Sequence, residues 1–187
     1  MRSITDRANI ILIGFSTTGK TTAGRALAQK LGWAFVDTDV WISGMAGQSI
    51  PEIFEEHGER HFRELESAAL NEALARQKTV IATGGGSVIK KSNREKMARL
   101  GWIVLLEAEP ESIFKRMQAE DAKSDVPIRP LLVDDDPLTR IIDLKAERHA
   151  VYHSVADKVV HTDGLSTAEV VNRILAWTQS LDQTIGE

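Results

Sequence analysis

A glycine-rich segment near the N-terminus has the residue types and the spacing of a phosphate-binding loop. Residues 14–21 read Gly-Phe-Ser-Thr-Thr-Gly-Lys-Thr, which fits the pattern G-x-x-x-x-G-K-[ST]. In this pattern, backbone N–H groups and the positive end of the following helix surround the β-phosphate of a nucleotide. Lys20 reaches the β- and γ-phosphates, and the Thr21 hydroxyl is placed to ligate Mg²⁺. The alternative is an ordinary glycine-containing turn with an incidental lysine.

The segments around this loop have the pattern of a parallel sheet covered by helices. Short apolar runs rich in β-branched residues alternate with amphipathic segments, which predicts strands buried on both faces. The expected strands are 10–13, 33–36, 79–82, 102–106 and 158–161. The first expected helix covers 21–31, and a second begins at Ser49 and is interrupted at Gly58. Two more are expected to be capped, one by Ser92 with Glu95 and one by Ser166 with Glu169. The remaining two run from Pro110 to about Met117 and onward from Pro137. The loop therefore joins a strand to a helix, as the motif requires.

Length, composition and charge exclude several classes of protein. The chain has 187 residues, of which 42% are hydrophobic, enough for one domain with a core that needs no disulfide or metal. It has no cysteine, so disulfides and cysteine–zinc sites are excluded. A net charge of −4 offers no basic surplus for nucleic acid, and the apolar runs are too short to span a membrane. We expect a soluble, cytoplasmic monomer that binds neither nucleic acid nor membrane.

One long stretch without hydrophobic periodicity interrupts the alternating pattern. It covers residues 118–136, and long aperiodic loops inside a compact domain are typically lids or disordered. Its end, Asp134-Asp-Asp136, could be a Mg²⁺ cluster, but we expect it to cap the helix after Pro137.

Two pairs of histidines have a spacing that could hold a metal ion. His57 and His61 are four residues apart, and so are His149 and His153. The sequence shows no third ligand and no H-E-x-x-H pattern, so we expect no metal site at either pair.

Four further blocks follow the loop in order, and with them the chain resembles the shikimate kinase family from about Asn9 to Leu175. Each block alone would be weak, whereas all four behind a phosphate-binding loop are specific. They are the D-x-D segment at 35–39, the G-E-x-x-F-R-x-x-E helix at 58–66, the A-T-G-G-G turn at 82–86, and the R-P-L-L lid segment at 129–132 with Arg148 and Tyr152 downstream.

The resemblance implies a fold and a reaction. The fold would be a three-layer α/β/α sandwich of the P-loop NTPase type, with a five-stranded parallel sheet in the order 2-3-1-4-5. Residues 1–187 would form a single domain, with a substrate-binding segment at about 37–74 and a mobile lid at about 118–136. The reaction would be the transfer of the γ-phosphate of ATP, with Mg²⁺, to the 3-hydroxyl of shikimate.

The resemblance also assigns the residues that hold the nucleotide and its metal. Arg116 would pack against adenine, and the lid residue Arg129 would close over the phosphates. Thr21 would ligate Mg²⁺, with Asp37 near the ion. The full nucleotide-binding set is Thr17, Thr18, Gly19, Lys20, Thr21, Thr22, Arg116 and Arg129. A lone loop arginine such as Arg129 could equally be a solvated side chain.

On the acceptor side, the resemblance assigns an aspartate, two arginines and a glycine turn. Asp39 would orient or deprotonate the substrate hydroxyl, and it follows a strand, where open α/β sheets bind ligands. Arg63 and Arg148 would bind the carboxylate, and Gly84, Gly85 and Gly86 would let the backbone approach the substrate. The alternatives left open are a capping pair of aspartates, a surface arginine paired with Glu59 or Glu66 on its own helix, and a bare tight turn.

The chain departs from the family pattern at two places. Many members have glycine at the position of Thr17, and a positive φ is costly for threonine, so we expect a slightly reshaped loop and an altered affinity for ATP. The segment between Arg116 and Arg129 is several residues longer than in typical members. Two other functions remain open, namely a gluconate kinase or another small-metabolite P-loop kinase, and a nucleotide-binding regulatory module.

Overall fold

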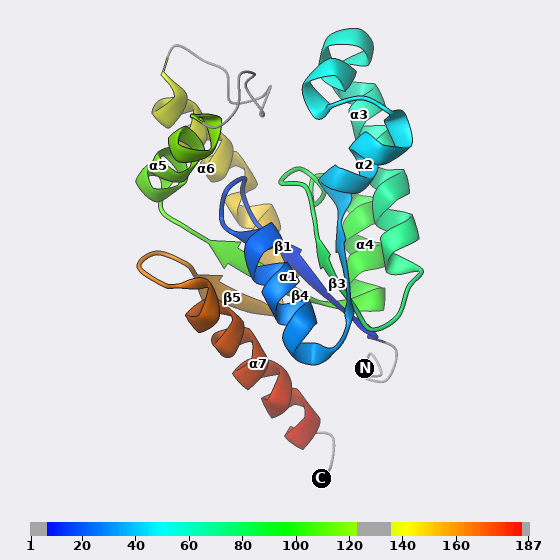
Figure 1. Cartoon of the computed structure of the whole chain (residues 1–187), viewed down its shortest axis with the longest axis vertical. Helices are drawn as coiled ribbons and strands as arrows, with labels where there is room; N and C mark the ends of the chain where they lie inside the picture. The colour runs from blue at the N-terminus through cyan, green and yellow to red at the C-terminus, as the bar shows by residue number, and fades with distance from the viewer. Residues whose placement is uncertain (1–6, 123–135, 185–187) are drawn as a thin grey trace.

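A five-stranded parallel sheet lies between two layers of helices in the computed structural model, which describes residues 7–122 and 136–184 (Figure 1). Every neighbouring pair of strands is parallel, and the order across the sheet is β2-β3-β1-β4-β5. The strands are β1 (Asn9–Ile13), β2 (Ala34–Asp37), β3 (Thr79–Ala82), β4 (Gly101–Glu107) and β5 (Lys158–His161). The predicted three-layer class and strand order are confirmed.

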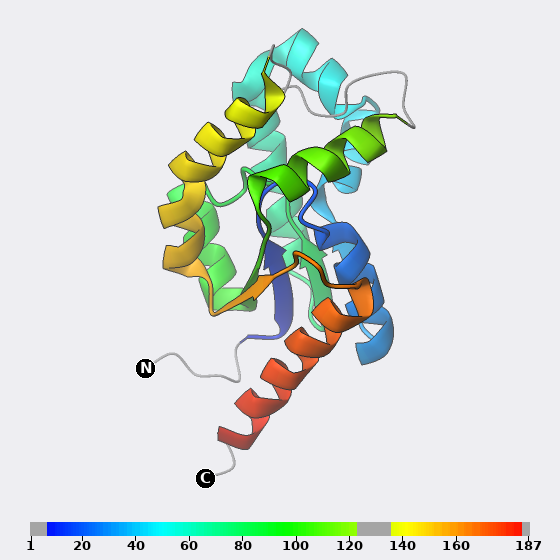
Figure 2. The same cartoon turned by 90° about the vertical axis from the view of Figure 1, so that its left-hand side faces the viewer.

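Seven helices connect and cover the strands within the described residues. They are α1 (Lys20–Leu31), α2 (Thr38–Ala46), α3 (Ile50–Leu74), α4 (Lys91–Leu100), α5 (Pro110–Asp121), α6 (Pro137–Val155) and α7 (Thr167–Thr184). Helices α1 and α7 lie side by side on one face of the sheet, as both views show (Figures 1 and 2). None of these helices has a stretch long and apolar enough to cross a lipid bilayer.

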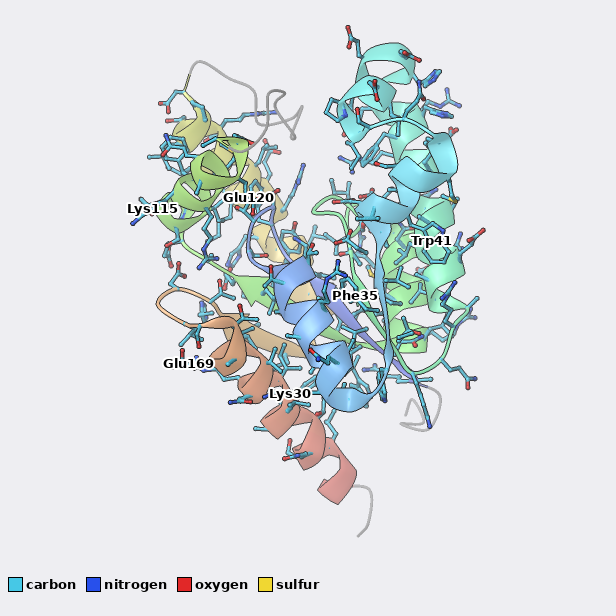
Figure 3. All side chains as sticks on the ribbon, viewed as in Figure 1. Lys30, Phe35, Trp41, Lys115, Glu120 and Glu169 are labelled. Carbon is cyan, nitrogen blue, oxygen red and sulfur yellow. The ribbon has the colours of Figure 1, made fainter. Side chains whose placement is uncertain are left out.

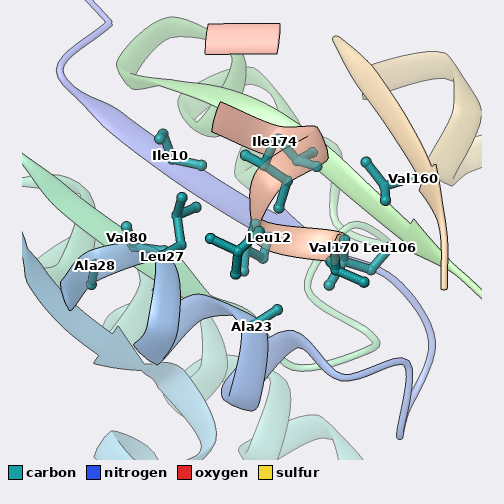
Figure 4. Packing of buried hydrophobic residues seen from close by; sticks show 12 residues of the cluster. Ile10, Leu12, Ala23, Leu27, Ala28, Val80, Leu106, Val160, Val170 and Ile174 are labelled. Atoms are coloured by element: carbon teal, nitrogen blue, oxygen red, sulfur yellow. The ribbon is translucent and has the colours of Figure 1, made fainter. Parts of the chain in front are cut away.

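Successive residues of the central strand point into two separate cores. Ile10 and Leu12 of β1 pack with residues of α1 and α7, which include Leu27 and Ile174 (Figure 4). Ile11 and Ile13 lie on the opposite face, among residues of α3, α4 and α6. Because side chains of a strand alternate between faces, a strand buried on both sides must be apolar throughout, as this one is.

The edge strand β2 is held against α1 by a close aromatic contact. The ring of Phe35 covers Gly24, where an added Cβ would stand 2.7 Å from its Cε2 atom (Figure 3). A larger residue at position 24 would therefore push β2 away from α1. This contact matters for the site because β2 ends at Asp37.

Several helix boundaries confirm the sequence predictions, and others do not. Ser166 and Glu169 form the expected reciprocal cap, and Asp136 accepts a hydrogen bond from Thr139 N at 3.2 Å. Gly58 interrupts α3 with φ 76° and ψ 174°, as predicted. The Ser92 cap was wrong, since α4 begins at Lys91 and no side chain caps it.

Hydrogen bonds to the preceding turn of the chain, instead of an N-cap side chain, fix the start of α4. The side chain of Asn93 donates to Ser87 O at 3.1 Å, and Arg94 donates to Val88 O at 2.7 Å. Both bonds tie the first turn of α4 to the preceding turn of the chain. Two further predictions were also incomplete, because α2 was not expected and α5 continues to Asp121, inside the segment assigned to the lid.

A buried asparagine joins the start of the central strand to its neighbours. Asn9 is 1% exposed, and its amide nitrogen donates to Arg76 O at 2.8 Å and Leu100 O at 3.5 Å. Its Oδ1 atom accepts from Thr79 N at 3.1 Å. One side chain therefore satisfies backbone groups at the entries to both strands that flank β1.

We expect Asn9→Ala to lower the free energy of unfolding by about 2–3 kcal/mol, because it leaves buried backbone groups without partners. Urea denaturation followed by circular dichroism measures this loss. The control is Asn172→Ala, which removes only an exposed contact with Lys30 and should change stability by less than about 0.5 kcal/mol. Equal losses in the two variants would contradict the proposed role of Asn9.

Candidate active site

The loop between β1 and α1 is shaped by two glycines. Gly14 has φ 142°, and a Cβ there would stand 2.2 Å from Leu106 O, so no other residue fits. Gly19 is the N-cap of α1 with φ 92°, and no side chain caps the helix. The N-terminus of α1 is therefore open to an anion, as a phosphate-binding loop requires.

Two side chains of the loop turn back onto its own carbonyl groups. Lys20 is 8% exposed, and its Nζ atom donates to Gly14 O at 3.0 Å and Phe15 O at 2.6 Å. Thr18 also donates to Phe15 O, at 2.9 Å. The ammonium group is thereby held inside the concave loop, where it can meet a phosphate.

Thr17 keeps the left-handed backbone that a glycine would favour. Its φ is 56°, so the expected reshaping is not seen at this residue. The Thr17 hydroxyl donates to Ile113 O of α5 at 3.2 Å, and its own carbonyl accepts from Arg116 at 3.4 Å. These two bonds join the loop to α5 and offset part of the strain of a positive φ.

Asp37 serves both as a helix cap and as the partner of the expected metal ligand. Its Oδ1 atom accepts from Asp39 N at 3.0 Å and Val40 N at 3.4 Å, at the start of α2. Its Oδ2 atom accepts from the Thr21 hydroxyl at 2.6 Å. A hydroxyl beside a carboxylate is the kind of oxygen set that Mg²⁺ binds, so these residues fit the expected ion.

Asp39 is an acid in an unfavourable environment. Its Oδ1 atom is buried and has no hydrogen-bond partner within residues 7–122 and 136–184. Burial raises the pKa of Asp39 to about 6, the negative charge of Asp37 adds to the rise, and the positive charge of Lys20 opposes it. An acceptor atom without a partner, beside a cation, is suited to receive a hydrogen bond from a substrate hydroxyl.

The three glycines after β3 bring the carboxylates of two other elements together. A Cβ on Gly84 would stand 2.7 Å from Asp39 Oδ1 and 2.8 Å from Glu66 Oε1. The Gly84 N–H donates to the Thr38 hydroxyl at 3.0 Å. No side chain at this position would leave room for both carboxylates.

The rest of the glycine turn touches the arginine of α3 and the phosphate loop. A Cβ on Gly86 would stand 2.0 Å from Arg63 Nη1, and one on Gly85 would stand 3.5 Å from Ser16 N. The turn therefore lies between the loop on one side and Arg63 on the other. Asp39, Arg63 and the phosphate loop meet at one place, as the sequence predicted.

Arg63 is held by two acids of its own helix. Its Nη1 atom lies 2.9 Å from Glu66 Oε2, and its Nη2 atom lies 2.9 Å from Glu59 Oε1. Glu66 is buried and also accepts from the Ser87 hydroxyl at 3.0 Å. The alternative pairing left open by the sequence is thus present, and it fixes the guanidinium toward Gly86.

Sequence reasoning considered Glu66 only as a possible surface partner of Arg63 and did not expect it to be buried. Its position three residues after Arg63, on the apolar face of α3 with Phe62 and Leu70, was the available signal. A buried carboxylate is stable only if it is paired, so an acid on an apolar helix face should have indicated a polar network.

Helix α6 supplies the second predicted arginine. The Arg148 guanidinium lies 5.8 Å from the ring centre of Phe15, in the phosphate loop. Burial raises the pKa of Tyr152 to about 12, and the protonated phenol donates to Gly85 O. A cavity of about 370 Å³ between α3 and α6 is lined by Glu59, Ile89, Arg140, Leu144, Glu147, Arg148 and Val151.

The remaining predicted nucleotide residues lie in three different situations. Arg116 donates to Thr162 Oγ1 at 3.1 Å and to Thr17 O, so it stands at the outer side of the phosphate loop. Thr22 is exposed in the first turn of α1. Arg129 lies outside the described residues.

Comparison with known proteins gives a consistent result. The family model described as shikimate kinase matches residues 16–179. Shikimate kinase of Symbiobacterium thermophilum is 40% identical over 167 residues, covering 89% of this chain and 94% of its own. Shikimate kinase of Caldanaerobacter subterraneus is 42% identical over 167 residues, which cover 89% of this chain and 94% of the relative.

Solved structures agree with the sequence comparison. Shikimate kinase from Acinetobacter baumannii, in complex with shikimate, superposes with a TM-score of 0.87 at 36% identity, covering 93% of this chain and 94% of that one. Shikimate kinase from Aquifex aeolicus superposes with a TM-score of 0.76 at 31% identity, and the match covers 94% of this chain and 98% of that one. With its phosphate loop, its buried aspartate and its glycine turn, this chain belongs to the shikimate kinase family.

Proposed function

We propose that this protein transfers the γ-phosphate of ATP to the 3-hydroxyl of shikimate and releases ADP and shikimate 3-phosphate. The observation that carries the proposal is the glycine turn at 84–86, which contacts the phosphate loop, Asp39 and Arg63 at once. The same turn therefore lines both the proposed nucleotide site and the proposed site for a hydroxylated acid. The homologous structure in complex with shikimate supports the choice of acceptor.

On the nucleotide side, the residues provide charge and orientation. The loop amides and the start of α1 would hold the β-phosphate, and Lys20 would leave its loop carbonyls to reach the transferred group. Thr21 and Asp37 would hold Mg²⁺, which when bound neutralises charge on the β- and γ-phosphates. Arg116 would pack against adenine from the outer side of the loop.

On the acceptor side, a carboxylate accepts the hydroxyl proton while two arginines fix the acid group. Asp39, with its pKa of about 6, is ionised at neutral pH and remains more basic than an ordinary aspartate. Arg63, oriented by Glu66, and Arg148 would bind the shikimate carboxylate through charge-assisted hydrogen bonds. The Gly85 N–H would donate to the substrate.

Catalysis of this reaction depends mainly on positioning and electrostatics, since phosphoryl transfer asks little covalent chemistry of the protein. Two cations, Lys20 and the lid residue Arg129, would offset charge developing on the transferred group. Closure of the segment 118–136 would exclude water as a competing acceptor. The phosphate loop, the substrate segment at 37–74 and this lid would work as one domain.

The same proposal includes the setting in which the protein acts. A net charge of −4 is consistent with a small-molecule enzyme that does not bind nucleic acid. All the site residues named above come from one chain, so a monomer would suffice. We place the enzyme in the cytoplasm, where ATP is supplied.

A coupled assay of ADP release, run with shikimate, with gluconate and without acceptor, tests the proposal. We expect rapid release only with shikimate, because its ring holds the carboxylate and the 3-hydroxyl at a fixed separation suited to Arg63 and Asp39, whereas gluconate is an open chain. Release with gluconate alone would instead identify a kinase of another metabolite. ATP binding without release in any arm would identify a regulatory module.

We expect Asp39→Asn to lower kcat by at least about 100-fold, because an amide cannot accept the hydroxyl proton. The steady-state rate at saturating ATP and shikimate measures this effect. Unchanged secondary structure by circular dichroism is the control. Near-normal turnover would show that Asp39 is not the base.

The same variant should be more stable than the parent chain at neutral pH. The folded protein holds the Asp39 proton up to pH 6, whereas the unfolded chain releases it near pH 4, so ionisation costs stability as pH rises between these values. We expect Asp39→Asn to raise the melting temperature by at least about 2 °C at pH 8 and to lose this advantage at pH 4. An equal or lower melting temperature at pH 8 would contradict the strained environment of Asp39.

We expect Arg63→Ala to raise the KM for shikimate by at least about 10-fold, because it removes charge-assisted hydrogen bonds to the carboxylate. The KM for ATP should change much less. Arg60→Ala is the matched control, since Arg60 lies on the same helix with its side chain 94% exposed and pairs only with Glu64 among the described contacts. Similar increases in both KM values would argue against a carboxylate clamp.

A further inference from the structure

A second cluster of chemically reactive side chains lies behind the phosphate loop, at the carboxyl end of β4. It consists of Glu107, the last residue of that strand, with His149 and His153 of α6. One ligand-type atom from each residue lies within 4.8 Å of the other two. The sequence predicted no metal site at this histidine pair for want of a third ligand, and the fold supplies one.

The cluster is already partly arranged as a chelating site. The Nε2 atom of His153 lies 3.2 Å from Glu107 Oε1, close to the separation of about 3.4 Å between two ligands of a tetrahedral ion bound at 2.0–2.2 Å. The rings of His149 and His153 are stacked with centroids 4.2 Å apart. A small rotation of the exposed His149 would bring all three atoms around one ion.

The electrostatic setting favours a cation. Glu107 is only 13% exposed, and its other oxygen, Oε2, lies 3.6 Å from Nδ1 of a third imidazole, that of His161 at the end of β5. Among the residues that the structure describes, no lysine or arginine lies within ion-pair distance of this carboxylate, although Lys145 of α6 lines the same cavity as Glu107. A divalent ion would supply positive charge to this carboxylate and would replace the contact that now joins His153 Nε2 to Glu107 Oε1.

The ligand types select the metal. Imidazole nitrogens suit Zn²⁺, Cu²⁺, Ni²⁺ and Fe²⁺, whereas Mg²⁺ prefers oxygen ligands and retains its water. Two histidines and one glutamate, with a remaining position open to water, form a ligand set that zinc adopts in proteins. This cluster is therefore chemically distinct from the oxygen set of Thr21 and Asp37 expected for the kinase magnesium.

We propose that Glu107, His149 and His153 bind one transition-metal cation, of which Zn²⁺ is the test ion, at a site separate from the reaction centre. The bound ion would fasten α6 to the end of β4. Helix α6 carries Arg148, and the small cavity that Glu107 and His149 line is also lined by Phe15 and Thr18 of the phosphate loop. The site thus holds in place an element that the active site uses.

The chain contains its own matched control for this proposal. His57 and His61 on α3 are also four residues apart, with ring centroids 4.9 Å apart. The acid beside them, Glu56, comes from the same exposed helix, at 3.7 Å from His57. Among the described residues, only the cluster on α6 combines two histidines with an acid from another element.

Isothermal titration of the untagged full chain with Zn²⁺, in excess Mg²⁺ and without nucleotide, tests the site. We expect one equivalent to bind and the melting temperature to rise when it does. Loss of a residue that only hydrogen-bonds a metal ligand typically weakens metal binding about 10-fold. His149→Ala and His153→Ala each remove a ligand itself, so each should weaken Zn²⁺ binding by more than that. The double variant His57→Ala/His61→Ala should bind as the parent chain does.

A second readout protects the test from folding defects and from non-specific chelation. Substitution with Co²⁺ should give the visible absorption of a low-coordinate nitrogen and oxygen site, and Glu107→Gln should abolish it while the apo melting curve shows a folded protein. Absence of a bound equivalent in the parent chain would overturn the proposal. An equal loss of Zn²⁺ affinity in the His149 or His153 variants and in the His57→Ala/His61→Ala variant would also overturn it. Because no substrate is used, failure here leaves the proposed kinase function untouched.

Discussion

The close approach of backbone to charged side chains at residues 84–86 is the constraint on which the site depends. A Cβ at Gly84 or Gly86 would overlap the groups that meet there, namely Asp39, Glu66 and Arg63. Because these positions carry no side chains, the segments after β1 and β3 can bring the phosphate loop next to Arg63, the proposed partner of the substrate carboxylate. Any larger residue would separate the two halves of the site.

Several charged side chains lie close together at this turn, and their repulsion and burial lower the stability of the folded chain. Asp39 is buried near Asp37 and close to Glu66, which raises its pKa and makes its ionised form unfavourable in the folded chain. Arg63 and Lys20 offset part of this repulsion, and the two apolar cores around β1 provide the remaining stability. Function at such sites commonly opposes stability, because a group poised to react is not at its energetic minimum.

Helix α6 connects the site to the rest of the fold. One helix presents Arg148 to the loop residue Phe15, Tyr152 to the carbonyl of Gly85, and His153 to Glu107 at the end of β4. The C-terminal half of this helix therefore contacts segments at the carboxyl ends of β1, β3 and β4. Helix α6 lines the cavity that it shares with α3, so a shift of α6 would change the shape of that cavity and move Arg148.

The class of fold and the phosphate loop could be predicted from the sequence, because they depend on local spacing and on the alternation of apolar strands with helices. The strand order was implied only by the resemblance to a family. The sequence could not reveal the partners of side chains that meet only across the fold. Glu107 and His153 are 46 positions apart in the chain, and the buried Glu66 accepts a hydrogen bond from Ser87, which is 21 positions away on another segment. Such contacts are decided by how the layers pack, since burial and charge compensation are properties of the assembled structure rather than of any segment.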